Sequence, residues 1–124
     1  MNISKASGID KVIESFVAAA KMHGAATEEG NWKKANRQYD LMATAFDQLK
    51  LHGRTEWKAS FLDLLQHENE FVRCAAAART LEFAPARAEQ VLIELSQQPG
   101  VVSLDAQMIL ERWRAGDLTL SNDV

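Results

Sequence analysis

The sequence predicts an all-α fold, namely a short right-handed α-solenoid of about six helices in three antiparallel pairs. Glycine and proline are rare, and most of them separate helix-length segments, at Gly24, Gly30, Gly53, Pro85, Gly100 and Gly116. No segment sustains the apolar–polar alternation of a half-buried strand, so we expect no β-structure. The second half of the chain also resembles itself at a fixed spacing, which is typical of stacked helix pairs.

Length and composition are those of an ordinary globular domain. The 124 residues are 47% hydrophobic and 25% charged, and we assign all of them, 1–124, to a single domain. The N-terminal segment lacks the apolar core of a secretory signal, and the apolar runs are too short to span a bilayer. We therefore expect a cytoplasmic protein without a membrane partner.

The first helix pair is predicted within residues 9–53. Its first helix extends from about Ile9 to about Ala26. Asn31 is placed to cap the second helix, where its side-chain oxygen can accept a hydrogen bond from an unpaired amide. Steps of three and four residues then place six side chains on one face, and we expect them in the core: Trp32, Ala35, Tyr39, Met42, Phe46 and Leu49. Asn36, beside this stripe, is either a buried polar residue or a residue at the solvent edge.

Four further helices are predicted in the rest of the chain. They start near Thr55, near Asn69, at Pro85 and after the Pro99–Gly100 break, and the last one stops at Gly116. Residues 117–124 are predicted to form a loose tail. The inward-facing positions expected in the four helices are Trp57, Phe61, Leu62, Leu64 and Leu65; Phe71, Cys74, Ala75, Ala78 and Leu81; Ala88, Val91, Leu92 and Leu95; and Val102, Ala106, Ile109 and Trp113.

A shift of thirty residues aligns these four helices as two copies of one unit. The apolar pairs that coincide are Phe61/Val91, Leu62/Leu92, Leu65/Leu95, Phe71/Val101, Val72/Val102, Cys74/Leu104, Ala76/Ala106, Ala78/Met108 and Phe83/Trp113. The polar turn between the helices aligns as well. We therefore predict a first repeat over 55–84 and a second over 85–116, with the second sealing the end of the stack.

The first copy resembles a HEAT repeat. It has a leucine-rich helix, a polar turn, and Val72-Arg73 opening an alanine-rich helix. Small alanines allow the second helices of neighbouring repeats to approach closely. We expect Arg73 to pair within the structure, with acids of a neighbouring repeat or with its own turn. The second copy has Val102-Ser103 at the equivalent positions, so a ladder of stacked arginines would stop there.

The order of three motifs resembles a bacterial family of short uncharacterised HEAT-like (armadillo-type) proteins, a domain of unknown function. The motifs are Ala35–Asp40, Val72-Arg73 with its alanine run, and Leu110–Gly116, and the similarity covers residues 9–118. The resemblance implies a fold and not a reaction. Proteins of this kind recur as protein-binding modules, and some resemble immunity proteins that neutralise a secreted toxin.

The two halves of the chain differ in charge. Residues 1–59 carry nine Lys and Arg against seven Asp and Glu, whereas residues 60–124 carry five Arg against ten acids and have no lysine. An acidic repeat half argues against nucleic acid, because phosphate binding rests on clustered Lys and Arg. It suits a basic protein partner, although ordinary solvated helix surfaces would also show such a pattern.

No residue pattern predicts catalysis, a cofactor or a metal site. Cys74 falls on an apolar stripe without an activating partner, so we expect a buried thiol. His23, His52 and His67 lie on separate segments near helix ends and lack metal-ligand spacing. Trp113 lies on a core stripe, which favours packing over ligand binding. Nucleotide-binding, hydrolase and Cys-x-x-Cys motifs are absent from the sequence.

These observations favour a non-enzymatic protein-binding module, most concretely an immunity-type inhibitor of a bacterial toxin with a basic domain. The second helices of HEAT-like pairs line the concave side, and their free faces supply the candidate contacts: Arg37, Asp40, Thr44, Asp47, Glu70, Arg73, Ala77, Thr80, Ser103, Gln107, Glu111 and Arg114.

Two alternatives stay open at this stage. One is an adaptor or regulatory subunit that scaffolds an enzyme or associates with itself, and the stripe containing Trp32 and Tyr39 could then form an intermolecular interface. The other, which the acidic repeat half disfavours, is a HEAT-like DNA glycosylase. The sequence does not distinguish a monomer from an oligomer.

Overall fold

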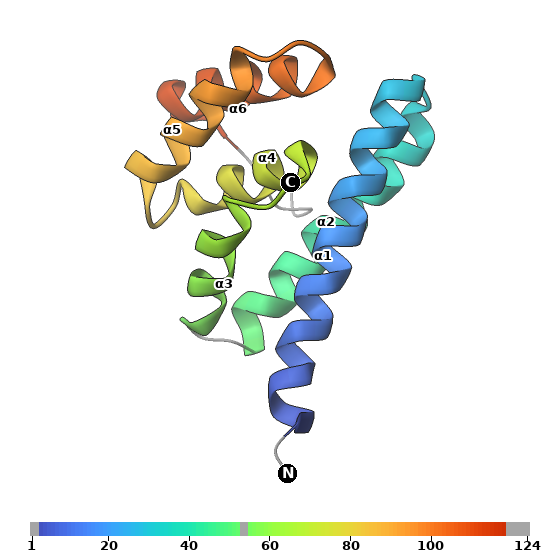
Figure 1. Cartoon of the computed structure of the whole chain (residues 1–124), viewed down its shortest axis with the longest axis vertical. Helices are drawn as coiled ribbons and strands as arrows, with labels where there is room; N and C mark the ends of the chain where they lie inside the picture. Colours follow the sequence, from blue (N-terminus) through green and yellow to red (C-terminus); the bar gives the residue numbers. More distant parts are fainter. Residues whose placement is uncertain (1–2, 53–54, 119–124) are drawn as a thin grey trace. The chain divides into compact units, whose positions relative to one another are not determined.

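The computed structural model describes residues 3–52 and 55–118, and within these ranges it contains six α-helices and no strand (Figure 1). The chain divides into two compact units. The first holds α1, α2 and the beginning of α3 as far as Ser60, and the second begins at Phe61. For the described residues, the prediction of helices without β-structure is confirmed.

The first unit is built on two long helices, α1 (Ile3–Glu29) and α2 (Trp32–His52), which pack against each other. Gly30 adopts a φ of 77° between them, a left-handed conformation in which an L side chain would be strained. The Oδ1 atom of Asn31 accepts a hydrogen bond from the Lys34 amide at 3.2 Å. This bond confirms Asn31 as the predicted cap of α2.

The core of this unit combines small and large apolar side chains from the two helices. Its buried members are Phe16, Ala19, Ala20, Ala26, Ala35, Met42, Ala43, Ala45, Phe46 and Leu49. Six alanines among them let the helix axes approach closely. Trp57 from α3 (Glu56–Leu64) is 4% exposed and meets Phe46 edge to face, with ring centroids 5.3 Å apart. The expected burial of Trp57 is therefore confirmed.

Trp32 is the exception to the predicted stripe of α2. Its side chain is 66% exposed, whereas the other members of the stripe are buried or half-buried. Trp32 is the first residue of α2, and helical side chains lean toward the N-terminus, so its ring extends past the end of the helix pair. Asn36 is exposed, which decides between its two predicted environments in favour of the solvent edge.

The helices of the second unit begin and end where the sequence predicts. They are the end of α3, α4 (Glu70–Thr80), α5 (Pro85–Ser96) and α6 (Val101–Ala115). Asn69 caps α4, and its Oδ1 accepts hydrogen bonds from the amides of Phe71 and Val72 at 2.9 and 3.2 Å. Pro85 occupies the first turn of α5. Gly116 ends α6 in the left-handed conformation, with a φ of 79°.

Helix α4 buries more of its residues than α5 or α6 does, and both of these helices pack against it. Its buried residues occur around most of its circumference and are Val72, Cys74, Ala76, Ala77, Ala78, Arg79 and Thr80. By contrast, α6 buries a single stripe formed by Val102, Ala106 and Leu110. Ile109 and Trp113, which the sequence places in the core of this helix, are only partly buried.

The thirty-residue alignment predicts matching environments, and at two positions this prediction is wrong. Cys74 and Ala78 are 4% and 1% exposed, whereas their counterparts Leu104 and Met108 are 66% and 45% exposed. The side of α4 that carries Cys74 faces α6, since Asp105 of α6 is close enough to act on the Cys74 thiol. Helix α6 is the final helix described, so no later helix of the second unit covers the equivalent side.

No helix in the described part of the chain is both long enough and apolar enough to cross a membrane. The predicted tail is described only at Asp117 and Leu118, and the remainder lies outside the described residues, as does the side chain of His52.

Candidate functional site

On α2, the predicted contact residues lie on one exposed face. Arg37, Asp40 and Thr44 are exposed, and Asp47 is half-buried. Their spacing of three and four residues places them side by side along the helix. This face carries charges of both signs and continues into a groove between α1 and α2.

The groove of the first unit has a volume of about 440 Å³ and an entirely uncharged lining. It is lined by Ser15, Ala18, Ala19 and Met22 of α1 and by Gln38, Leu41, Thr44, Ala45 and Gln48 of α2. Met22 and Leu41 are 43% and 53% exposed, so two large apolar side chains meet solvent here. Thr44 belongs to both the groove and the predicted contact face.

On α4, the predicted contact face is only partly correct. Glu70 and Arg73 are half-buried, but Ala77 and Thr80 are fully buried and cannot contact a partner at the surface. The Thr80 hydroxyl donates a hydrogen bond to the Ala76 carbonyl at 2.7 Å. The prediction failed because it left one face of α4 free, whereas this helix is covered on nearly every side.

The side chain of Arg73 is directed to the turn that precedes its own helix. Its Nη1 atom donates to the carbonyl oxygens of His67, at 2.7 Å, and Glu68, at 3.1 Å. The Asn69 amide in turn donates to the Nδ1 atom of His67 at 3.0 Å. Of the two partners predicted for Arg73, the structure selects its own turn.

On α6, three of the four predicted contact residues interact within the unit. The Ser103 hydroxyl donates to the Gly100 carbonyl at 2.9 Å, and the Gln107 side-chain amide donates to the Ser96 carbonyl at 3.3 Å. Glu111 is exposed, and Arg114 forms an ion pair with α5. The four residues share one side of α6, next to the exposed Leu104 and Met108.

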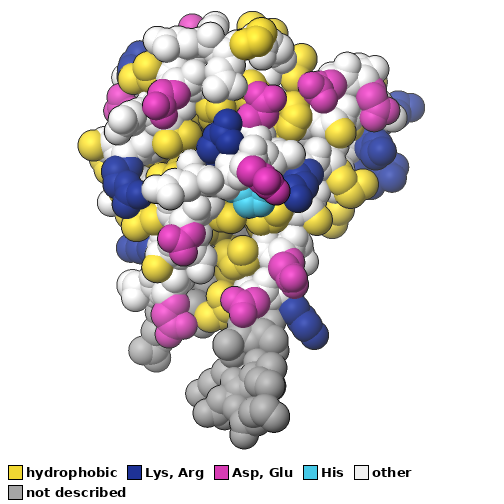
Figure 2. All heavy atoms as spheres, viewed as in Figure 1, with side chains coloured by type: hydrophobic (Ala, Val, Ile, Leu, Met, Phe, Trp, Pro, Cys, Tyr) yellow, Lys and Arg dark blue, Asp and Glu magenta, His cyan; other side chains and the backbone are white. Residues whose placement is uncertain are grey.

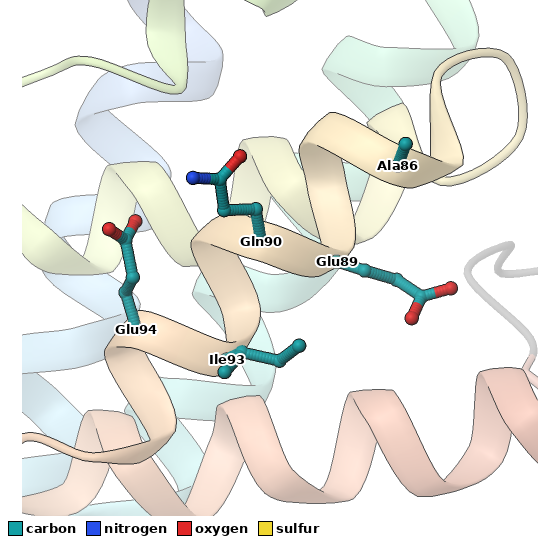
Figure 3. A pocket seen from close by; sticks show the side chains of 5 residues that line it. All are labelled: Ala86, Glu89, Gln90, Ile93 and Glu94. Carbon is teal, nitrogen blue, oxygen red and sulfur yellow. The ribbon is translucent and has the colours of Figure 1, made fainter.

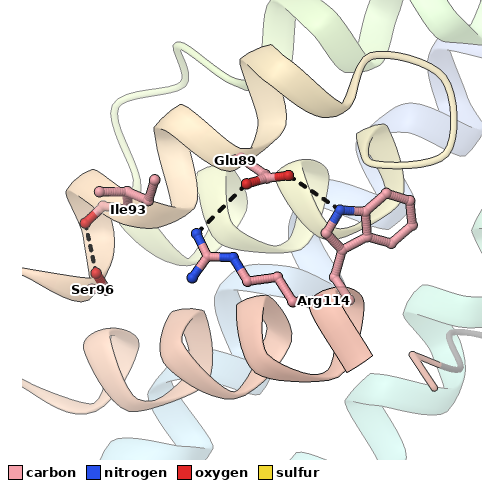
Figure 4. A network of polar contacts seen from close by, with 5 residues as sticks. Glu89, Ile93, Ser96 and Arg114 are labelled. Carbon is pink, nitrogen blue, oxygen red and sulfur yellow. Dashed lines mark hydrogen bonds and ion pairs between the residues drawn. The ribbon is translucent and has the colours of Figure 1, made fainter. Parts of the chain in front are cut away.

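Glu89 links α5 to the C-terminal part of α6 (Figure 4). One carboxylate oxygen accepts a hydrogen bond from the indole N–H of Trp113 at 3.3 Å. The other lies 3.6 Å from an Nη2 atom of Arg114. Trp113 therefore has a structural role, in agreement with the sequence, although it acts through its polar edge as well as its packing.

A shallow depression of about 410 Å³ follows the outer surface of α5. Figure 3 shows its five lining residues, Ala86, Glu89, Gln90, Ile93 and Glu94, all of which belong to this helix. Ile93 and Glu89 project toward the side of α6, while Glu94 and Gln90 project in a different direction, away from α6. With Glu89 held by Trp113 and Arg114, Glu94 is the more exposed of the two acids.

Cys74 and Arg79 form a buried polar environment in α4. Burial raises the pKa of the Cys74 thiol from its usual value of 9.0 to about 12, the Asp105 carboxylate adds to this increase, and the Arg79 charge opposes it. Arg79 is 1% exposed and donates from Nη1 to the Ala75 carbonyl at 3.3 Å. The thiol therefore stays protonated at neutral pH, which removes the nucleophilic form of this cysteine.

The described residues place no three His, Cys, Asp or Glu side chains where they could jointly hold a metal ion. His23 stacks at a tilt against Tyr39, with ring centroids 5.9 Å apart, and His67 belongs to the turn before α4.

The view in Figure 2 shows Lys and Arg interspersed with Asp and Glu, with hydrophobic side chains exposed between them. That face therefore offers mixed charge and apolar contacts.

The sequence family of the chain follows from comparison with known families. Residues 10–113 match the model of the domain of unknown function DUF2019. The chain belongs to the DUF2019 family. This agrees with the resemblance to an uncharacterised family that the sequence motifs indicate, and the match extends over most of the chain. No curated protein and no solved structure matches it.

In this DUF2019 chain, the sequence-based list of contact residues missed the exposed apolar side chains. Met22 and Leu41 lie in the α1–α2 groove, and Leu104 and Met108 lie on α6. A signal was available for the first two, because they lie off the apolar stripes of their otherwise amphipathic helices. Leu104 and Met108 also lie off the predicted stripe of their helix, but the repeat pairs them with Cys74 and Ala78, which the sequence places in the core.

Proposed function

We propose that this DUF2019 chain is a non-enzymatic protein-binding module. The observation that carries the proposal is the uncharged α1–α2 groove, in which Met22 and Leu41 are exposed beside polar but neutral side chains. Apolar side chains exposed together on a folded helix pair are typical of a surface that another protein covers. The partner that fits such a groove presents apolar side chains to it.

The form that we propose for the scaffold is a short right-handed α-solenoid with two HEAT-like repeats. Two features support it. Helices α3 and α4 correspond to α5 and α6 under a shift of thirty residues, and a central alanine-rich helix separates the leucine-bearing ones. A rigid stack of this kind is pre-organised, which lowers the entropy lost on binding.

The specific activity that we favour is inhibition of a bacterial toxin with a basic domain. The acidic balance of residues 60–124, five Arg against ten acids, supports a basic partner. An inhibitor of this type needs no chemistry of its own, because it blocks the active site of the toxin. The Cys74 thiol is buried and protonated, and the Arg73 side chain bonds the turn before α4, so both residues have structural roles that are consistent with such an inhibitor.

The test is quantitative affinity capture from the source organism with wild-type protein and with a Met22→Ser, Leu41→Ser double variant. We expect one protein to be enriched by the wild type and lost from the groove variant. Leu51→Ser is the matched control, because Leu51 is 79% exposed and lies outside the groove lining. The captured protein is then purified, and the toxin version requires that stoichiometric wild-type chain suppresses its enzymatic activity.

Two results would contradict the proposal. If the wild type enriches no protein over an unrelated helical bait, the protein-binding function fails. If the groove variant captures the same protein equally well, the function stands but its assignment to the α1–α2 groove is wrong.

A self-associating adaptor is the second candidate, and the exposure of Trp32 favours it. Trp32 is the first residue of α2, and its side chain is 66% exposed. Light scattering distinguishes this candidate, since self-association predicts a mass above 13.8 kDa that returns to the monomer value in Trp32→Ser. A monomer at all concentrations would exclude it.

A further inference from the structure

The outward side of α6 carries exposed apolar side chains at helical spacing. Leu104 and Met108 are four residues apart and are 66% and 45% exposed, so they lie next to each other on one face. Gln107 and Glu111 are exposed on the same side. The buried stripe of Val102, Ala106 and Leu110 lies on the other side of the helix. We call the four exposed residues, Leu104, Gln107, Met108 and Glu111, the outer α6 face.

The internal repeat shows that a helix packs against the equivalent side of α4. Under the thirty-residue shift, Leu104 and Met108 correspond to Cys74 and Ala78 of α4, which are 4% and 1% exposed. That side of α4 is closed by a helix of the same unit, α6 itself. The outer α6 face thus occupies the position at which the next helix of a stack would pack.

Glu111 is the acidic residue of this face, and the exposed Arg112 flanks the face on the other side of Met108. Arg114 lies three residues after Glu111 and would be its natural intrahelical partner, but Glu89 of α5 holds the Arg114 guanidinium at 3.6 Å. Glu89 is itself fixed by the indole N–H of Trp113. The Glu89–Arg114 pair therefore directs the cation away from Glu111, whose carboxylate remains on the exposed face beside Met108.

From these contacts we propose that the outer α6 face binds an amphipathic helix of a partner protein, with apolar side chains over Leu104 and Met108 and a Lys or Arg opposite Glu111. The inference rests on the proposed protein-binding function and assigns it a second surface, in the other unit. A second copy of the chain fits less well. A symmetric pairing of two α6 helices would bring two Glu111 carboxylates near each other around only two apolar side chains per copy.

The experiment uses the full chain and a synthetic peptide probe. The probe is an amphipathic helix with leucines at three- and four-residue spacing and arginines flanking the leucine stripe. A scrambled peptide and a peptide with Glu in place of Arg are its controls. Backbone amide NMR spectra are recorded during titration with each peptide. We expect the arginine peptide alone to shift the amides of the outer α6 face.

Three variants make the test specific. Leu104→Ser with Met108→Ser should weaken binding about tenfold or more, as loss of central apolar contacts does in helix recognition. Glu111→Lys should reverse the preference between the arginine and glutamate peptides. Leu51→Ser, which changes a still more exposed leucine in the other unit, should leave the affinity unchanged. Far-UV circular dichroism checks that each variant keeps its helical content.

The outcomes separate this inference from the proposed function. Equal shifts with the scrambled peptide, or shifts confined to other surfaces, overturn the α6 proposal. Shifts confined to the α1–α2 groove overturn it too but support the groove. Concentration-dependent shifts of the outer α6 face without peptide would assign that face to a second copy. Equal capture of one protein by the wild type and the groove variant, together with a positive peptide titration, would count against the groove alone.

Discussion

Arg73 and His67 are joined across the turn before α4 by a hydrogen bond of 2.7 Å from the guanidinium Nη1 to the backbone carbonyl. The same nitrogen reaches the Glu68 carbonyl at 3.1 Å. A half-buried charged donor thus satisfies two carbonyls in the segment that links α3 to α4. This arrangement makes Arg73 a structural residue.

Replacing Arg73 should therefore reduce stability. Hydrogen bonds from charged groups contribute about 1.5–3 kcal/mol when they are well formed, and partial exposure of Arg73 places the expected loss for Arg73→Ala near the lower end, ~1–2 kcal/mol. Urea unfolding followed by circular dichroism measures it. Arg87→Ala, at an exposed position of α5, is the control and should change the midpoint little. Equal midpoints for both variants would show that the turn bonds are dispensable.

Asn69→Ala should reduce the stability of the protein more than Asn36→Ala does. The Asn69 side chain accepts hydrogen bonds from two amides of the first turn of α4, so Asn69→Ala should cost about 1 kcal/mol. Asn36→Ala is the matched control: Asn36 is exposed within α2, and alanine favours a helix interior. The control should be neutral or slightly stabilising in the same urea titration. A destabilised Asn36→Ala variant would contradict the solvent-edge placement of Asn36.

The Cys74 thiol should be inert in the folded protein. Its pKa is raised to about 12, chiefly by burial, so the reactive thiolate is scarce at pH 8, and the side chain is also inaccessible. A chromogenic disulfide reagent should react slowly with the native chain and rapidly in concentrated urea. Fast reaction without denaturant would contradict the described burial.

The same pKa shift predicts a direction for alkaline stability. In the unfolded chain Cys74 loses its proton near its usual pKa of 9.0, whereas the folded chain keeps the proton until about pH 12. The unfolded state therefore binds fewer protons between these values, and the contribution of Cys74 to stability is complete below pH 9 and declines above it. In Cys74→Ala this part of the decline should be absent from unfolding free energies measured from pH 8 to pH 10.5.

Ala77 should not tolerate enlargement. It is fully buried in α4, and extra methyl groups in a packed core cost about 1–3 kcal/mol. Ala77→Leu should therefore lower the thermal midpoint, and Ala25→Leu, at an exposed position of α1, should not. If Ala77→Leu unfolded like the wild type, the original assignment of Ala77 to an exposed contact face would regain support.

Local sequence signals located the helices of this chain because each signal acts within one turn. Asn31 and Asn69 accept amide hydrogen bonds at helix starts, Pro85 fits a first turn that needs no amide donor, and Gly116 takes a left-handed conformation. These interactions involve neighbours along the chain, so they could be read before any tertiary contact was known.

What only the tertiary structure decided is how much of each helix is covered. Periodicity assigns one apolar stripe to a helix, but the number of neighbours is a property of the packed unit. Helix α4 is buried around most of its circumference, which includes Ala77 and Arg79, while α6 buries a single stripe and leaves Leu104 and Met108 at the surface, although α4 and α5 both pack against it. The sequence alone determined that the chain is helical and where most of its helices start and stop, but it placed the first helix at about Ile9–Ala26, whereas α1 extends over Ile3–Glu29 and includes Gly24. The sides of α4 and α6 that remain free to bind depended on contacts between residues distant in the chain.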